Sequence, residues 1–117
     1  MGESILREKS YAFALRIVRL SQFLNDEKRE FVLSKKVLDS GTAIGSLVEE
    51  ARQGVNRADF GQRLAIAAKE DFKTNYWLRL LHDSLHITSE QADSLLFDCE
   101  ELQKMLISSL KTTRNES

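Results

Sequence analysis

Apolar residues recur three or four positions apart along most of the chain, in four segments separated by short polar joints. In the last segment, Leu95, Cys99, Leu102 and Leu106 keep this spacing. The spacing places apolar side chains on one face of an α-helix, and no segment shows the strict alternation of a half-buried β-strand. The pattern predicts four helices, over about residues 4–24, 28–53, 57–85 and 89–111.

The joints between these segments carry residues typical of helix ends. Gly54 suits the position after a helix C-terminus, Asn56 suits an N-cap, and Thr88 and Gln91 have the spacing of a capping box. The chain contains no proline, which favours long uninterrupted helices. Long helices with short joints pack as antiparallel neighbours. We therefore expect an all-α, up-down-up-down antiparallel four-helix bundle, with residues 1–117 forming a single domain.

The apolar surface of the first and third predicted helices exceeds what one bundle core requires. A core-facing stripe spans about 100° of a helix. Tyr11 and Leu15 lie outside the sector that contains Phe13, and Phe72 and Tyr76 form a second apolar side on the third helix. Because exposed patches of this size are rare on monomers, the pattern predicts a homo-oligomer. The alternative is a larger, irregular core.

Composition and charge narrow the class of protein. The 117 residues are 42% hydrophobic and 30% charged, which is typical of a globular protein. A net charge of −1 gives no overall attraction to nucleic acid. The single cysteine, Cys99, excludes an internal disulfide framework and fits a reducing compartment. No uncharged apolar run near the N-terminus is long enough for a signal peptide or a membrane span, so we expect a cytoplasmic protein without membrane contact.

Four stretches resemble, in order, the helices of the four helix bundle protein family, also called 23S rRNA-intervening-sequence proteins. They are FALRIVRLSQFL, FVLSKKVLDSGTAIGSLVEEA, ADFGQRLAIAAKEDFKTNYWLRLLHDS and CEELQKMLISSLKT, and they lie within residues 13–112. The most specific part is SGTAIGSLVEEA, where the family usually has GTSIGANIAEA. This chain departs from that pattern at Ala43, Ser46, Leu47 and Val48.

The resemblance implies a four-helix protomer that assembles into a ring-shaped homopentamer. Some family members are encoded in insertions within large-subunit rRNA genes. Related accessory variability-determinant proteins of diversity-generating retroelements act with reverse transcriptases, and their basic surface is thought to engage nucleic acid. This chain is nearly neutral, unlike those basic relatives. For most members no biochemical activity is established, and the number five comes from the resemblance alone.

Two glycines, Gly41 and Gly45, lie inside the second predicted helix. The spacing G-x-x-x-G without a following lysine, between helical flanks, excludes a phosphate-binding P-loop. Residues three and four apart share a helix face, so small side chains gather on one side of this helix. We call this set the helix-packing seam: Ser40, Gly41, Ile44, Gly45 and Val48. The seam predicts close approach of another helix of the same bundle.

Candidate catalytic and metal-binding residues are few. His82 and His86 are four residues apart, but the H-E-x-x-H pattern of zinc proteases is missing. The Glu-x-x-His motif of di-metal bundles is missing too, because position 79 is arginine. Cys99 lies at an apolar helix position and is expected to be a buried small side chain. The sequence therefore predicts no catalytic residue, no metal site and no cofactor, and identifies no small-molecule substrate.

Basic side chains on the first two helices are the candidate contacts to nucleic acid. They are Lys9, Arg16 and Arg19 on the first helix, and Lys28, Arg29, Lys35 and Lys36 on the second. In a symmetric ring they would form a basic belt, whereas in isolation they are an ordinary solvated surface. We expect a non-enzymatic, homo-oligomeric scaffold or interaction protein. The alternative is an accessory protein that binds RNA or DNA, and a metal-dependent enzyme is the weakest of the three hypotheses.

Overall fold

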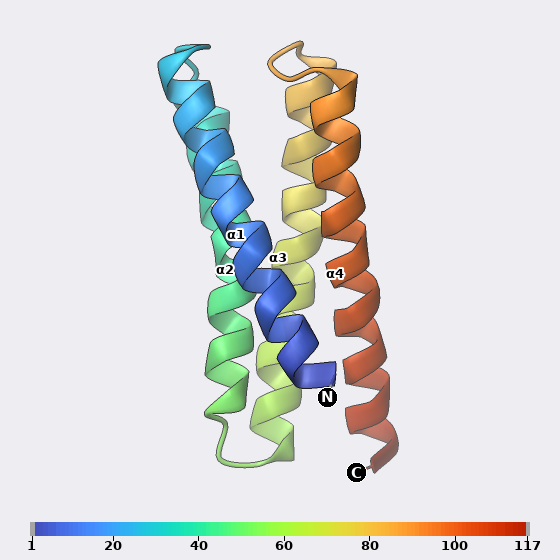
Figure 1. The fold of residues 1–117 in the computed structure, drawn as a ribbon. Coiled ribbons are helices and arrows are strands. Elements are labelled where there is room, and N and C mark those ends of the chain that lie inside the picture. The colour runs from blue at the N-terminus through green and yellow to red at the C-terminus, as the bar shows by residue number, and fades with distance from the viewer. Residues whose placement is uncertain (1, 117) are drawn as a thin grey trace.

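The computed structural model describes residues 2–116, which form four α-helices and no strand. The helices are α1 (Gly2–Asp26), α2 (Val32–Arg52), α3 (Arg57–Asp83) and α4 (Ser89–Glu116). Each helix packs against the next one in sequence, and α4 also contacts α1 (Figure 1). The molecule measures 47 × 21 × 19 Å. This arrangement agrees with the predicted four-helix bundle.

One buried apolar cluster runs through the centre of the bundle, and all four helices contribute to it. Its largest fully buried apolar side chains are Phe13, Ile17, Leu24, Val37, Ile44, Leu64, Leu78, Leu81, Leu102 and Leu106. On each helix these residues are three, four, seven or fourteen positions apart, which returns them to the same face, so the apolar stripe predicted from the sequence forms the core. Within residues 2–116, no helix combines the length and the apolar character that a membrane span requires.

The second helix begins at Val32, later than the predicted residue 28. Arg29 has a φ of 52°, a left-handed conformation that does not continue a helix. The Glu30 carboxylate accepts hydrogen bonds from the backbone N–H of Leu33, at 2.6 and 2.9 Å, and so caps the first turn. Residues 28–31, which the periodicity assigned to the second helix, therefore belong to the connection between α1 and α2.

The fourth helix runs to Glu116, beyond the predicted end at residue 111. No glycine or proline follows Leu110 to stop it. The hydroxyls of Thr112 and Thr113 donate to the carbonyls one turn earlier, at 3.1 and 2.9 Å, which is compatible with continued helix. The third helix differs in the other direction, since it ends at Asp83 rather than at the predicted residue 85.

The loop after α3 begins with a Schellman motif. The N–H of His86 donates to the carbonyl of Leu81 at 2.9 Å, and the N–H of Leu85 donates to the carbonyl of His82 at 3.0 Å. Leu85 occupies the position after the helix end with a φ of 66°, where glycine is the usual residue. Its side chain is 86% exposed, so it contributes almost no packing. Leu85 therefore carries backbone strain without compensation from burial.

Substituting Leu85→Gly should stabilise the protein by about 1 kcal/mol, because glycine adopts the left-handed conformation without steric cost. Chemical denaturation followed by circular dichroism measures the change. The matched control is Val55→Gly, which removes a similarly exposed apolar side chain at a position with no positive φ. An equal gain in both variants would show that the loss of exposed apolar surface, rather than relief of strain, causes the effect.

Candidate functional site

The two glycines of the helix-packing seam lie directly against α1. A β-carbon at Gly41 would lie 2.8 Å from both Cγ1 and Cγ2 of Ile17. A β-carbon at Gly45 would lie 3.3 Å from the carbonyl oxygen of Ser10. Both distances are shorter than ordinary van der Waals contact, so even an alanine would push the two helices apart or displace side chains. At these two positions glycine permits the close approach of α1.

The other members of the seam are buried, but they do not all face α1. The hydroxyls of Ser40 on α2 and Thr74 on α3 are 2.9 Å apart and form a buried hydrogen bond. Ile44 and Val48 belong to the apolar core. The seam therefore contributes to two helix contacts, one with α1 through the glycines and one with α3 through Ser40.

A buried carboxyl group lies in the core, at Asp71 on α3, and its side chain is fully buried. The thiol of Cys99 on α4 donates weak hydrogen bonds to the Asp71 carbonyl oxygen at 3.5 Å and to Oδ1 at 3.6 Å. The second carboxyl oxygen, Oδ2, has no hydrogen-bond partner among the described residues. An uncompensated charge at this place would be costly, so the neutral acid is the favoured form.

Burial in the core raises the pKa of Asp71 from 3.8 to about 7. The hydrogen bond from Cys99 lowers the pKa of Asp71, and the negative charge of Glu100 raises it. Burial also raises the pKa of the Cys99 thiol, and the neighbouring Asp71 carboxyl adds to that shift. The Asp71 carboxyl is therefore mostly protonated below about pH 7, the Cys99 thiol stays protonated at neutral pH, and a buried neutral thiol is a poor nucleophile.

Sequence reasoning placed Cys99 correctly as a buried side chain but did not identify Asp71. A signal for Asp71 was present, because it continues the stripe formed by Leu64, Ala67, Thr74 and Leu78 on α3. Carboxylates are rarely fully buried, so the position of Asp71 on the stripe does not by itself predict its burial.

The two histidines do not converge on a common site. His82 lies between Asp83 and Ser89, with Nδ1 3.0 Å from the carboxylate and Nε2 2.9 Å from the hydroxyl. His86 contacts the hydroxyl of Ser84 at 2.8 Å. Within residues 2–116 no three His, Cys, Asp or Glu side chains are grouped closely enough to hold a metal ion. The histidine contacts instead fix the loop between α3 and α4.

Two of the three basic candidates on α1 are engaged within the bundle. Lys9 pairs with Glu101 at 2.9 Å, and Arg16 pairs with Asp98 at 2.7 Å. Arg16 also donates to the hydroxyl of Ser94 at 2.9 Å. All of these partners lie on α4, so the pairs join the first and last helices. Because their charges are largely compensated, Lys9 and Arg16 contribute little to a positive surface.

The basic candidates assigned to the second helix do not share one helix face, because Lys28 and Arg29 precede α2. Three of the four side chains lie over aromatic rings: Lys28 over Phe23 at 5.9 Å, Arg29 over Phe31 at 5.4 Å, and Lys36 over Trp77 at 5.4 Å. The fourth, Lys35, pairs with Asp39 at 3.2 Å. These cations are distributed around one end of the bundle rather than along a stripe.

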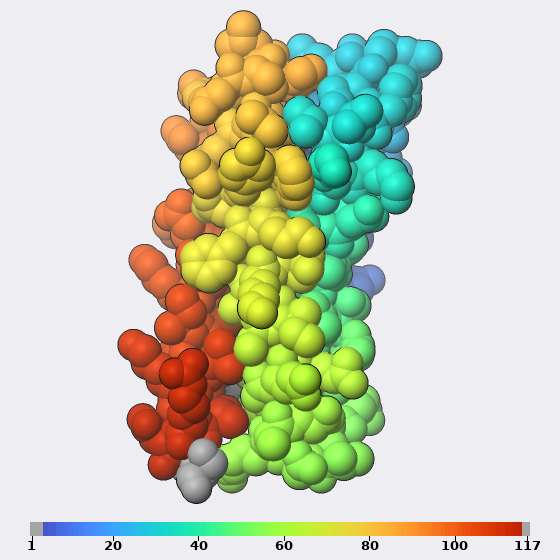
Figure 2. All heavy atoms as spheres, turned by 180° about the vertical axis from the view of Figure 1, so that it is seen from behind, coloured from blue at the N-terminus to red at the C-terminus, as the bar shows by residue number. Residues whose placement is uncertain are grey.

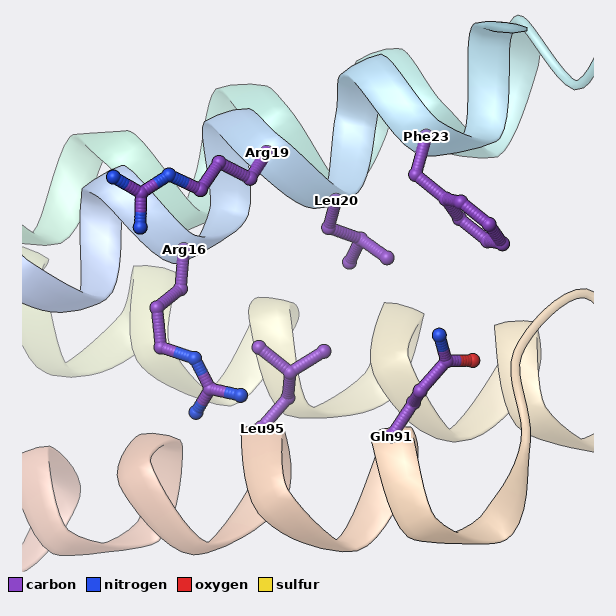
Figure 3. Close-up of a pocket in the computed structure, with 6 residues that line it drawn as sticks. All are labelled: Arg16, Arg19, Leu20, Phe23, Gln91 and Leu95. Atoms are coloured by element: carbon purple, nitrogen blue, oxygen red, sulfur yellow. The ribbon is translucent and has the colours of Figure 1, made fainter. Parts of the chain in front are cut away.

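A shallow groove of about 310 Å³ separates α1 from α4 (Figure 3). Its lining residues are Arg16, Arg19, Leu20 and Phe23 from α1, with Gln91 and Leu95 from α4. Leu20 and Leu95 point toward each other across the middle of the groove, with the two arginines at one end and Phe23 and Gln91 at the other (Figure 3). The groove is therefore mainly apolar, and the charge of Arg16 is already compensated by Asp98.

Large apolar side chains are exposed on α1, α3 and α4. Tyr11 on α1 is 68% exposed, Phe72 and Tyr76 on α3 are 55% and 50% exposed, and Phe97 on α4 is 68% exposed. Figure 2 shows the face that α2 and α3 form, with α4 along one side. The second apolar sides predicted from the sequence are thus at the surface and are not part of an enlarged core. Such surface is typical of protein contacts.

Comparison with known proteins gives a consistent result. A family model described as "23S rRNA-intervening sequence protein" matches residues 3–108. The chain is also similar to the crystal structure of a protein with unknown function from the S23 ribosomal protein family of Bacteroides thetaiotaomicron. The two chains are 48% identical with a TM-score of 0.94, and the match covers 95% of this chain and 99% of that chain. No match was found among curated proteins.

Proposed function

The chain belongs to the 23S rRNA-intervening sequence protein family, and from that premise we propose that it is a non-enzymatic, homo-oligomeric helical-bundle scaffold. The observation that carries this proposal is the exposure of large apolar side chains on three helices, among them Tyr11, Tyr76 and Phe97. Aromatic side chains are enriched in the buried centres of protein interfaces. A second copy of the chain is the simplest partner that would cover them.

The titratable groups support a non-enzymatic role. Asp71 and Cys99, the two groups with strongly raised pKa values, are sealed in the core where no substrate can reach them. His82 and His86 are each engaged by neighbouring side chains of the same loop region. We place the protein in the cytoplasm, where the buried free thiol of Cys99 would stay reduced.

We propose a ring-shaped pentamer as the assembled form, following the family resemblance described above. Static light scattering coupled to gel filtration tests it. The expected mass is five times the 13.4 kDa of the protomer. A stable oligomer of another number would reject the pentamer and keep the scaffold. A monomer at micromolar concentration would contradict self-association, and with it the central part of the proposed function.

Binding of RNA or DNA is the second candidate function, and one observation favours it. Arg19, Lys28, Arg29 and Lys36 have no carboxylate partner within the part of the chain that the structure describes, so they keep charge available for phosphates. The resemblance to accessory proteins of diversity-generating retroelements would make a reverse transcriptase the associated enzyme. Repeating the basic residues around a ring would multiply the phosphate contacts.

Gel-shift titration with RNA and with DNA at several salt concentrations tests this second function. Binding through phosphates should be strongest at about 50 mM salt and fall steeply toward about 200 mM. The variant Lys28→Glu/Arg29→Glu should weaken it, whereas Lys35→Glu should have a smaller effect because Lys35 is already paired. No shift of either nucleic acid at low salt would exclude this function.

A further inference from the structure

The outer surface of α3 carries a ridge of exposed aromatic and basic side chains. This α3 ridge consists of Lys69, Phe72, Lys73, Tyr76 and Arg79. Phe72 and Lys73 are adjacent, and each member lies three or four residues from another, which places the set on one side of the helix, opposite the core stripe. The guanidinium of Arg79 lies 5.8 Å from the ring of Tyr76, and Lys73 has a Glu70 oxygen at 3.4 Å. The ridge carries three cations, and among the described residues only the carboxylate of Glu70 pairs with one of them, so the ridge has a net positive charge.

The outer surface of α4 carries the opposite charge. This α4 ridge consists of Glu90, Asp93, Phe97 and Glu100, all exposed and again spaced three or four residues apart. None of its three carboxylates has a salt-bridge partner among the described residues. The neighbouring Asp98 and Glu101, by contrast, pair with cations of α1. The α4 ridge is therefore an exposed aromatic ring with uncompensated negative charges on both sides.

We propose that the α3 ridge of one copy of this chain docks on the α4 ridge of a second copy. This inference rests on the proposed self-association and identifies the surfaces that mediate it. Lys69 to Arg79 and Glu90 to Glu100 each span eleven residues, or about 15 Å of helix from the first to the last, so the two surfaces match in length. The contact pairs three cations with three carboxylates while burying the exposed aromatic rings of both helices.

Charge also decides which pairs of ridges meet. Two α3 ridges would bring six cations together, and two α4 ridges would bring six carboxylates together, so like-charge repulsion disfavours both symmetric contacts. The contact of α3 with α4 is heterologous, since each copy offers a different surface to each of two neighbours. Repeating such a contact closes a ring when the rotation between copies fits. With such a rotation, the α3–α4 contact closes an assembly without any further surface.

Charge reversal tests the docking. The α3 variant carries Lys69→Glu, Lys73→Glu and Arg79→Glu, and the α4 variant carries Glu90→Lys, Asp93→Lys and Glu100→Lys. Each variant alone should have the mass of a protomer in light scattering, because its two ridges now have the same sign. Mixed in equal amounts they should associate by strict alternation into even-numbered or open assemblies rather than a ring of five, since the acidic α3 ridge of one variant meets the basic α4 ridge of the other. Circular dichroism checks that each variant remains helical.

The control reverses three cations elsewhere, with Lys35→Glu, Arg52→Glu and Lys111→Glu. It changes the net charge as much as the α3 variant does and should keep the mass of the unmodified protein. Oligomers of unchanged mass for both ridge variants would overturn the docking and leave self-association intact. A mixture that stays monomeric would overturn the pairing of α3 with α4. A monomeric unmodified protein would remove the proposed function together with this inference.

Discussion

Replacing Asp71 with asparagine should stabilise the protein increasingly as the pH rises, by up to about 4 kcal/mol above pH 7. Asparagine has nearly the same shape as the carboxyl group and carries no charge at any pH. The substitution therefore keeps the packing against Cys99 and removes the cost of ionising a fully buried group. Urea denaturation of both proteins between pH 4 and pH 8 measures the difference.

The sign follows from the proton balance. Burial raises the pKa of Asp71 to about 7 in the folded protein, whereas the unfolded chain loses this proton near the ordinary value of 3.8. Between these pH values the folded state binds more protons, so stability falls as pH rises. Below about pH 4 both states are protonated, and above about pH 7 both are ionised, so the difference between Asp71→Asn and the unmodified protein should be level outside this window.

The control for this experiment is Asp26→Asn, which replaces an exposed carboxylate at the end of α1. Its effect on the free energy of unfolding should be small at both ends of the pH range. Taking the difference between variant and unmodified protein cancels the other carboxylates that titrate over the same range. A difference for Asp71→Asn that does not grow with pH would contradict the neutral buried carboxyl.

Introducing an alanine at Gly41 should destabilise the protein by about 1–3 kcal/mol, the usual cost of overpacking a core. The new methyl group would lie 2.8 Å from two carbons of Ile17, which is itself fully buried. The matched control is Gly61→Ala on α3, where the methyl group would meet only a Thr113 methyl at 3.4 Å. That substitution should stabilise by up to about 1 kcal/mol through helix propensity.

A double-mutant cycle ties the effect to the contact with α1. Ile17→Ala alone should cost about 2–5 kcal/mol, because it leaves a cavity. In the presence of Gly41→Ala the cost should be smaller, with a coupling energy of about 0.5–3 kcal/mol, because the added methyl group occupies part of that cavity. Additive effects, or a gain for Gly41→Ala as large as that for Gly61→Ala, would show that α1 does not approach α2 closely at this point.

The helices and the core were predictable from the sequence because the helical repeat of apolar residues determines both. Residues such as Phe13, Leu64 and Leu106 repeat at the helical period, and the structure buries them. Helix ends were less predictable, since they depend on the conformation of single residues. Because Arg29 adopts a left-handed backbone conformation, α2 begins only at Val32. Lys28 and Arg29 therefore do not lie on the helix face on which they were expected.

The side-chain contacts of the candidate site were harder to predict from the sequence than the fold. The spacing of residues in the sequence shows which face of α2 carries small side chains. It does not show that Gly41 lies against Ile17 or that Ser40 lies against Thr74. The pairing of Arg16 with Asp98 joins residues far apart in sequence and depends on how the helices are arranged. Asp71 follows the stripe of the core, yet only the packed structure shows that no water reaches it.

The order of the helices around the bundle has a consequence for how the chain folds. The contacts α1–α2, α2–α3 and α3–α4 join neighbours along the chain through short loops, and α1–α4 alone joins its two ends (Figure 1). Contacts between sequence neighbours cost little chain entropy, so a bundle of this kind folds within about microseconds to milliseconds. Because the contact between α1 and α4 closes the longest loop, we expect it to form after the hairpins, together with the pairs that Lys9 and Arg16 make with α4.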